Sequence, residues 1–304
     1  MNMFKVCLAA NVFFVACISY GASFVATEAS GSRFGDQLSL YAKAKAVSYL
    51  FGLTYLHRPF LYSKYLQLHR METPYRNKHF SKIIKVKDAA SLPQLLNENK
   101  EDNVLYLVNY YTRLNLFGLE SKFWQCLQKF VRPVKPIGSV IPNEFVEDTV
   151  TVAVHVRKGD ATRHKRYFGT KWHLDEDYIK VLYSLLRRLE TAVAYVYIFT
   201  DDRNPRELMK KIERGVKQLG AAEANACCHI GFRLPTITFD CNSRTNKQTP
   251  QAIFSDFFNI ISFDYLVRPR TSNFSVMAGL IGQHKEVLPV CSNRRNAKKG
   301  RKNK

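Results

Sequence analysis

The second half of the sequence alternates between apolar runs of strand length and amphipathic segments of helix length. Strand-like runs occupy residues 150–156 and 194–200, helical patterns occupy 175–190 and 204–220, and 255–282 has the pattern helix, strand, helix. This alternation predicts an α/β fold with a parallel sheet, because parallel neighbours are joined by helical crossovers. Ligands of such sheets bind beyond the carboxyl ends of the strands.

Polar clusters follow three of these predicted strands. They read RKGD at 157–160, TDD at 200–202 and RPRTSN at 268–273. Because the carboxyl ends of parallel strands meet at one edge of the sheet, we expect the three clusters to form a single site.

The first half predicts a separate α/β domain. A strand at about 23–27 leads through a loop of small residues into a helix that begins near Asp36, a plausible anion-binding corner. A strand follows at 103–111 and a helix at 119–131. Residues 132–145 contain three prolines and one glycine, which is typical of a connection. We therefore expect one domain at 23–135 and a second at 146–292.

The chain is strongly basic, with a formal net charge of +21. Its last eleven residues carry seven cations and no acid, so we interpret 293–304 as a solvated basic tail. Removing those seven charges lowers the net charge from +21 to +14. Residues 58–87 add eight Lys or Arg against the single acid Glu72. Such fields attract nucleic acids, anionic membranes and phosphorylated small molecules.

The N-terminus and the cysteines leave alternatives open. Residues 1–22 contain Lys5 followed by an apolar run. This pattern fits a signal peptide, a membrane anchor or a buried element of the first domain. The seven cysteines form no C-x-x-C pair and no metal-ligand spacing, so they predict neither a zinc site nor a disulfide framework. A single bridge among the last four cysteines stays open.

Arg157 is the strongest candidate for chemistry, because it stands where a buried strand ends. Its guanidinium is a planar fork of donors that matches two phosphate oxygens at once. Asp160 is placed to hold that guanidinium, and an ion pair that merely closes the strand end is the structural alternative. His155 lies inside the strand, where we expect it to pack.

The stretch HVRKGD at 155–160 resembles the H-x-R-R-x-D motif of the superfamily that contains the α-1,2-, α-1,6- and protein O-fucosyltransferases. In that family the arginine at the position of Arg157 binds the pyrophosphate of GDP-fucose. Lys158 stands where the family has a second arginine, which keeps the charge and loses the fork. The resemblance places His155, Arg157 and Lys158 among the donor-binding residues.

Further stretches resemble the family in the same order. Asp201 and Asp202 are similar to a strand-end TDD of the α-1,6 enzymes. Residues 255–282 are similar to the third motif, in which an Asp at the position of Asp256 contacts the guanine and residues at Ser272 and Asn273 meet the phosphates. The loop containing Gly35 is similar to the G-x-FG(N/D) loop that opens these enzymes. The likeness covers about 31–53 and 150–282.

Each of these residues also has a structural interpretation. Asp201 and Asp202 suit the N-cap region of the next helix, and Asp256 suits the first turn of a helix. Paired aspartates also suggest a metal site, but the resemblance implies a metal-independent enzyme. Asn273-Phe274-Ser275 matches the glycosylation pattern, and we expect Asn273 to face the site unmodified.

The catalytic base is the least defined part of the prediction. The loop 161–174 contains no acid, although the α-1,6 enzymes carry a lysine and a glutamate shortly after the motif. The remaining candidates are Asp160, His164 and His173, or a group of the N-terminal domain or the acceptor. Tyr167, Phe168 and Trp172 of this loop suit stacking on sugar rings.

The resemblance implies a GT-B fold, with two Rossmann-like domains and a cleft between them. Residues 23–135 would form the acceptor side and 146–292 the donor domain. It implies inverting transfer of fucose from GDP-fucose to a glycan or protein hydroxyl, of α-1,2 or α-1,6 type. GDP-fucose is then the donor substrate, and no cofactor, metal or specific nucleic acid is expected.

Two other functions stay open. The same fold could use another nucleotide sugar, or the chain could be a basic polyanion-binding protein that does no catalysis. The N-terminus favours the secretory pathway or membrane association, with the cytoplasm as the alternative.

Overall fold

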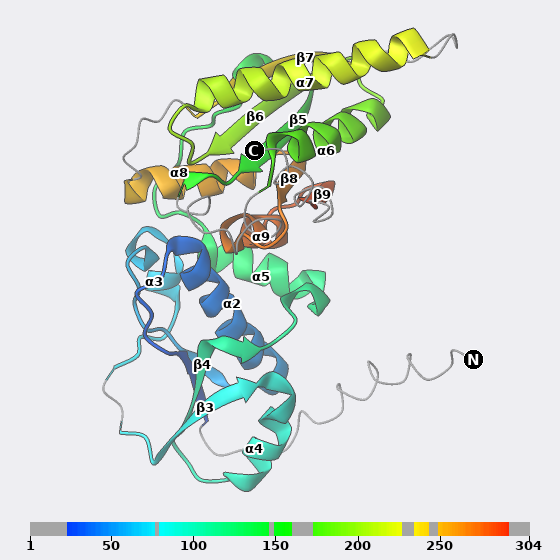
Figure 1. Cartoon of the computed structure of the whole chain (residues 1–304). Helices are drawn as coiled ribbons and strands as arrows, with labels where there is room; N and C mark the ends of the chain where they lie inside the picture. Colours follow the sequence, from blue (N-terminus) through cyan, green and yellow to red (C-terminus); the bar gives the residue numbers. More distant parts are fainter. Residues whose placement is uncertain are drawn as a thin grey trace, which may run out of the picture. The chain divides into compact units, whose positions relative to one another are not determined.

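The computed structural model describes residues 23–76, 79–145, 149–159, 173–226, 234–242 and 249–291, with the side chains of 224–226 excepted. The chain divides into two compact units, Met1–Lys135 and Pro136–Lys304. Each unit contains its own parallel sheet and its own helices (Figure 1). The structure therefore confirms the predicted α/β class with parallel sheets.

Unit 1 has a four-stranded sheet in the order β2-β1-β4-β3. All its pairings are parallel. Its strands are β1 (Phe24–Thr27), β2 (Thr54–Leu56), β3 (Lys82–Asp88) and β4 (Val104–Arg113). Its α-helices are α2 (Phe34–Phe51), α3 (Leu68–Met71), α4 (Leu92–Glu98) and α5 (Ser121–Val131). Short 3₁₀ turns lie at Ser63–Tyr65, Ala89–Ser91 and Leu116–Gly118.

Helix α2 is buried along most of its length, which explains why its apolar residues are not confined to one stripe. The helix ends at Gly52, whose φ of 66° is a left-handed conformation that favours glycine. Glu72, the single acid of the basic segment 58–87, is buried against this helix. It accepts a hydrogen bond from the Tyr41 hydroxyl (2.6 Å) and pairs with Lys45 (3.1 Å). That acid therefore stabilises the unit 1 core.

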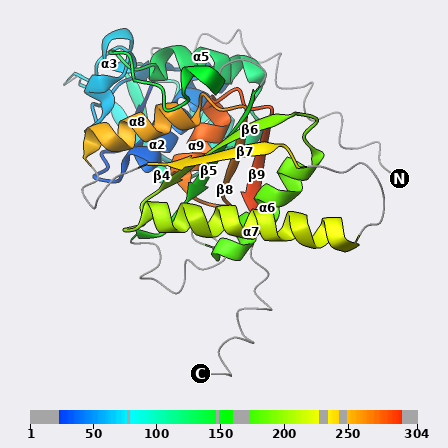
Figure 2. The same ribbon diagram turned by 90° about the horizontal axis from the view of Figure 1, so that it is seen from above.

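Unit 2 has a five-stranded parallel sheet in the order β7-β6-β5-β8-β9. Its strands are β5 (Thr149–Val156), β6 (Val193–Thr200), β7 (Thr236–Cys241), β8 (Tyr265–Pro269) and β9 (Glu286–Val290). Its helices are α6 (Asp175–Arg188), α7 (Pro205–Ala226), α8 (Pro250–Ile260) and α9 (Asn273–Ile281), with a 3₁₀ turn at Asn143–Phe145. Helices α6 and α7 lie on one face of the sheet, and α8 and α9 on the other (Figures 1 and 2).

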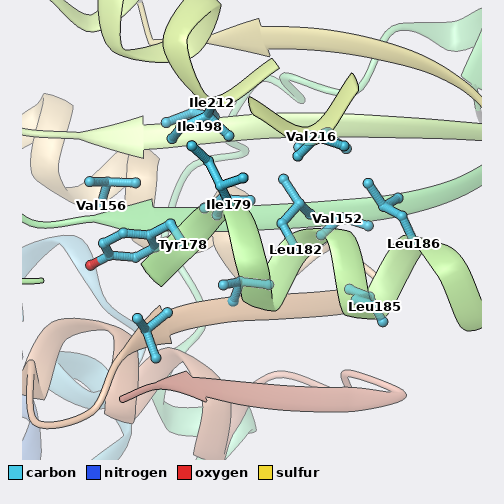
Figure 3. Packing of buried hydrophobic residues seen from close by; sticks show 14 of the residues in the cluster. Val152, Val156, Tyr178, Ile179, Leu182, Leu185, Leu186, Ile198, Ile212 and Val216 are labelled. Carbon is cyan, nitrogen blue, oxygen red and sulfur yellow. The ribbon is translucent and has the colours of Figure 1, made fainter. Parts of the chain in front are cut away.

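The alternation of side chains along β5 divides its residues between these two faces. Val152, Val154 and Val156 point toward α6 and α7 and join the main core of the unit. Figure 3 shows Val152 and Val156 packed with aliphatic residues of β6, α6 and α7 and with Tyr178. His155 points to the opposite face, where its ring contacts Phe274 of α9 at 5.4 Å between centroids. By the same alternation, we expect the side chain of Arg157 to point to the face that His155 occupies.

Several predictions lie outside the described residues. These are the signal peptide or anchor at 1–22, the basic tail at 293–304, and the loop that contains Asp160 and His164. Within the described ranges, no helix combines the length and apolar character needed to cross a membrane.

Candidate functional site

The strand order of unit 2 singles out one place for a ligand. Numbered along the unit, the order β7-β6-β5-β8-β9 is 3-2-1-4-5, so the order in which strands are added reverses between β5 and β8. In doubly wound sheets the ligand crevice opens at this switch point, beyond the carboxyl ends of the two strands. The residues at this end of β5 and β8 are Arg157 and the segment from Arg268 to Asn273.

His155 is a buried polar residue at this edge of the sheet. Its side chain is buried, and its pKa is lowered to about 3 by burial and then by the positive charges of Arg157 and Arg268. The imidazole is therefore neutral at physiological pH. Its packing on Phe274 agrees with the expectation that it packs, and its role in donor binding stays a prediction.

Lys158 points to the other face of the sheet, toward helix α6. Its ammonium pairs with Asp175 in the first turn of that helix (2.5 Å), and Lys211 of α7 reaches the other oxygen of the same carboxylate (2.8 Å). Burial raises the pKa of Asp175, but the hydrogen bonds from the two lysines outweigh it and the pKa falls below its usual value. The structure thus gives Lys158, a predicted donor-binding residue, a protein partner.

Asp201 and Asp202 follow β6 and shape two turns. Asp201 accepts a hydrogen bond from the backbone N–H of Lys158 (2.5 Å) and lies directly beneath Gly159. Asp202 accepts one from the backbone N–H of Asn204 (2.8 Å), just before helix α7. Asp201 therefore fixes the turn that presents Arg157, and Asp202 forms the turn at the start of α7. Contact of either carboxylate with a donor nucleotide stays a prediction.

Asp256 lies in the middle of α8, which begins at Pro250. The alternative that it is an acid of the first helical turn is therefore wrong. The helix starts earlier than the apolar pattern suggests because Thr249 caps it, its hydroxyl oxygen accepting from the backbone N–H of Ala252 (3.2 Å). Asp256 remains the predicted contact for guanine.

Ser272 and Asn273 stand at the start of α9, beyond the end of β8. Ser272 is the N-cap residue and is only 1% exposed, yet its hydroxyl makes no capping bond and has no partner among the described residues. Asn273 is the first residue of the helix. A buried hydroxyl at a helix N-terminus is suited to an anionic ligand, because the helix dipole favours negative charge there.

Arg268 is a site residue that the sequence reasoning did not single out. It belongs to β8 and is 7% exposed, and its Nη1 donates to the carbonyl oxygens of Pro269 and Arg270 (both 3.0 Å). The register pairs Val154 with Val267, so Arg268 is level with His155 on the neighbouring strand. The feature of the sequence that could have identified Arg268 is a cation inside the apolar run YLVRP.

His173 was a candidate base, and the structure places it immediately before α6. It is fully buried, with its ring 6.2 Å from that of Tyr178. Such burial closes it to an acceptor hydroxyl, so it is a poor candidate for the base. The other two candidates, Asp160 and His164, lie outside the described residues.

Unit 1 offers a cavity of about 350 Å³ at the carboxyl ends of β1 and β2. Gln37 of α2 donates to the carbonyl of Ser30 (3.1 Å), while its buried Oε1 has no partner in the described ranges. The cavity is also lined by Glu28 and Arg58. Glu28 pairs with Lys85 (2.7 Å), and the guanidinium of Arg58 lies over the ring of Tyr75. Gly35 lies in the adjacent first turn of α2 and is buried. This combination of amide, carboxylate and guanidinium groups suits a ligand that carries hydroxyl groups.

A metal site is not evident in this part of the chain. Among the residues that the structure describes, no three His, Cys, Asp or Glu side chains are grouped so that they could hold a metal ion. The cationic groups at the edge of the unit 2 sheet are instead Arg157 and Arg268.

Comparisons with known proteins find likenesses in structure alone. No family model matches the sequence, and no curated protein matches it. The chain is similar to solved structures of POFUT1 in complex with GDP-fucose, with 10% identity over 90% of this chain and 99% of the other, at a TM-score of 0.49. A mutant of FUT1 from Arabidopsis thaliana in complex with GDP has 11% identity over 94% of this chain and 75% of the other, at a TM-score of 0.49.

A third similar structure is NodZ alpha-1,6-fucosyltransferase soaked with GDP-fucose. It has 12% identity over 86% of this chain and 93% of the other, at a TM-score of 0.42. All three proteins are described with GDP or GDP-fucose. Likenesses at these identities and TM-scores are too distant to assign an activity to this chain.

Proposed function

We propose that this protein is a fucosyltransferase that moves fucose from GDP-fucose to a hydroxyl group of a glycan or protein. The observation that carries the proposal is Arg157, delivered by β5 to the switch point of a 3-2-1-4-5 parallel sheet. The motif around it resembles the H-x-R-R-x-D motif of the GDP-fucose enzymes. Asp256, the predicted guanine contact, and Ser272, at the start of α9, come later in the chain. They occur in the same order as the corresponding residues of that family.

The proposed reaction is a direct displacement at the anomeric carbon of fucose. The acceptor oxygen forms a bond to that carbon while the bond from the carbon to the β-phosphate oxygen breaks, so the configuration inverts. The proton of the acceptor hydroxyl passes to a base, for which Asp160 and His164 remain candidates. Negative charge grows on the departing GDP, where the Arg157 guanidinium stabilises it most strongly in the transition state.

We propose further that the enzyme works without a metal ion, because guanidinium groups and the α9 N-terminus supply the positive potential that Mg²⁺ supplies elsewhere. Unit 2 would hold the donor, and unit 1 would hold the acceptor in a GT-B arrangement. The linkage would be of α-1,2 or α-1,6 type. The predicted N-terminal signal peptide or anchor motivates placing the protein in the secretory pathway or at a membrane.

The first test is a thermal-shift panel of GDP, GDP-fucose, UDP, ADP and a nucleic-acid oligomer. Ligands that bind only the native state raise its melting temperature, so GDP and GDP-fucose should stabilise the protein and UDP and ADP should not. Equal shifts with all nucleotides would remove the guanine specificity assigned to Asp256. A response to the oligomer alone would favour the polyanion-binding function that the net charge of +21 suggests.

The second test is transfer itself. The protein should release GDP from GDP-fucose in the presence of glycan or peptide acceptors, and it should do so in excess EDTA. Loss of this activity on chelation, with recovery on adding Mg²⁺ or Mn²⁺, would contradict the metal-independent reaction.

A further inference from the structure

The motif that surrounds Arg157 normally carries a second arginine, and in this chain Lys158 takes its place. The structure shows that the Lys158 ammonium is bound to Asp175, with the lysine side chain 18% exposed and the carboxylate 13% exposed. Lys158 extends from the face of β5 opposite to His155, toward α6. A positive charge that is already paired with a carboxylate on that face offers little to a diphosphate beside Arg157.

Arg268 is a buried cation in a different situation. It is only 7% exposed, and its recorded partners are two backbone carbonyls, both on Nη1. Its Nε is buried with no hydrogen-bond partner, and no carboxylate pairs with it in the described part of the chain. Burying a charge without an opposite charge is costly, and an anionic ligand at this position would offset that cost.

Arg268 and Arg157 share one edge and one face of the sheet. Arg268 is level with His155 across the β5–β8 pairing, and Arg157 follows His155 by two residues. After burial, the positive charges of both guanidinium groups lower the pKa of the His155 imidazole, in keeping with this placement. The buried Ser272 hydroxyl, four residues after Arg268, completes a cationic corner at the start of α9.

We infer that Arg268 is a second diphosphate-binding residue, which supplies the guanidinium that Lys158 cannot. This inference rests on the proposed function and names a residue outside the H-x-R-R-x-D motif. One arm of the guanidinium holds the carbonyls of residues 269 and 270, so the side chain is fixed before the ligand arrives. The remaining donors of the fork are the ones that bind the diphosphate of the nucleoside diphosphate.

The competing explanation is that Arg268 only braces the turn between β8 and α9. The two explanations differ in what the residue does for phosphate groups. A brace would disturb the whole nucleotide site, so guanosine and GDP would lose affinity together. A diphosphate ligand would lose affinity for GDP and leave guanosine almost unchanged.

The test measures the dissociation constants of GDP and of guanosine for the full chain and for Arg268→Gln, by competition against a fluorescent GDP analogue. We expect Arg268→Gln to weaken GDP by roughly 10- to 100-fold, the range for losing a hydrogen bond to a charged group. Guanosine should change by less than about twofold, since it has no phosphate to lose. The melting temperature without ligand shows whether the variant is folded.

Arg214→Gln is the matched control, because Arg214 is an exposed arginine of helix α7, which covers the sheet face opposite α9. It should bind GDP like the unaltered protein. If Arg268→Gln does not fold, Arg268→Lys is measured in the same way, and the loss of the fork should still weaken GDP several-fold.

Three results would overturn the inference: GDP binding unchanged in the Arg268 variant that folds, equal loss of guanosine and GDP, or an equal effect of Arg214→Gln. Failure of the unaltered protein to bind GDP would instead remove the proposed function itself.

Discussion

Arg157 is the single residue on which the proposed chemistry depends most. Replacing it by lysine keeps the charge and removes the planar fork. We expect Arg157→Lys to lower kcat roughly 100-fold or more, comparable with the loss of an oxyanion donor, and to change GDP-fucose binding less. Steady-state kinetics with varied GDP-fucose separates the two effects. If the variant melts at a lower temperature while its folded fraction keeps full activity, Arg157 is only a strand-end ion-pair residue.

Lys158 should behave differently, because its ammonium is bound to Asp175. We expect Lys158→Ala to cost about 1 kcal/mol of unfolding free energy, since the pair is partly buried and Lys211 still neutralises the carboxylate. GDP affinity should change by less than about threefold. Chemical denaturation and GDP titration measure these two quantities. A large loss of GDP affinity at unchanged stability would instead make Lys158 the donor ligand that the motif implies.

His155 makes stability depend on pH. Its pKa is about 3 in the folded chain, lowered by burial and by the charges of Arg157 and Arg268, against about 6.5 when unfolded. Between these values the unfolded state binds the extra proton, so stability falls as the pH drops from about 6.5 toward 3, by up to about 1.4 kcal/mol per pH unit. His57, with a pKa of about 4, adds to the same trend in unit 1.

Denaturation at several pH values between 7.5 and 5 tests this. His155→Gln should show a shallower loss of stability with acid than the unaltered protein. His79→Gln, at an exposed position, is the matched substitution. An identical pH dependence in His155→Gln and the unaltered protein would show that this imidazole does not carry the effect.

Arg157 could be predicted as a site residue from the sequence alone, because an arginine that directly follows an apolar strand is recognisable there. The partner of Lys158 could not be identified from the sequence, because Asp175 lies 17 residues further along the chain, at the start of α6, and only folding brings the two together. Arg268 was missed for the opposite reason. The polar run RPRTSN looked like a loop, whereas β8 continues through Arg268 to Pro269 and buries it.

At the scale of elements, the buried parts of unit 2 were the predictable ones. The strands expected at 150–156 and 194–200 are β5 (Thr149–Val156) and β6 (Val193–Thr200), and both are almost wholly buried. The edge strands β3 and β7 were not predicted. Each leaves much of its length exposed, so its side chains lack a clear apolar period.

The turn after β5 depends on Gly159. Its φ of 25° is a conformation that disfavours other residues, and an added methyl group would meet the Asp201 carboxylate, with Cγ at 2.8 Å. We expect Gly159→Ala to cost roughly 1–3 kcal/mol of stability and to weaken GDP binding, because the turn that presents Arg157 must move. Denaturation and GDP titration measure both.

Gly138→Ala is the control, since no atom lies within 4 Å of the added methyl group there. It should leave both quantities unchanged. Normal GDP binding by Gly159→Ala would mean that the turn adapts and does not fix the position of Arg157.

At the scale of the whole molecule, the net charge and the candidate site make different contributions to ligand binding. The cations of 58–87 lie in unit 1, whereas Arg157 and Arg268 lie in unit 2. A net charge of +21 raises the rate at which any anion meets the chain, but it does not distinguish GDP from a polyanion. Selectivity must come from fixed donors such as a guanidinium fork, which is why the guanosine comparison is more informative than salt dependence.

The two units also allow a test of where the donor binds. Among the residues that the structure describes, the main core of unit 2 draws on none from unit 1. Residues 138–140 belong with it, because Asn259 bonds the backbone of Gly138 (3.2 Å) and Val140 (3.0 Å), and Tyr195 donates to the Val140 carbonyl (3.1 Å). A polypeptide of residues 136–304 should therefore fold by itself.

This polypeptide should bind GDP within about threefold of the full chain, because every predicted donor residue except Gly35 lies in it. It should transfer no fucose, since the proposed acceptor side is unit 1. Cooperative thermal unfolding establishes that the polypeptide is folded, and GDP titration then measures its affinity. If it unfolds cooperatively but binds GDP more than about tenfold more weakly, the first turn of α2 with Gly35 contributes to the donor site. The corner between β5 and β8 would then be only part of the site that holds the nucleotide.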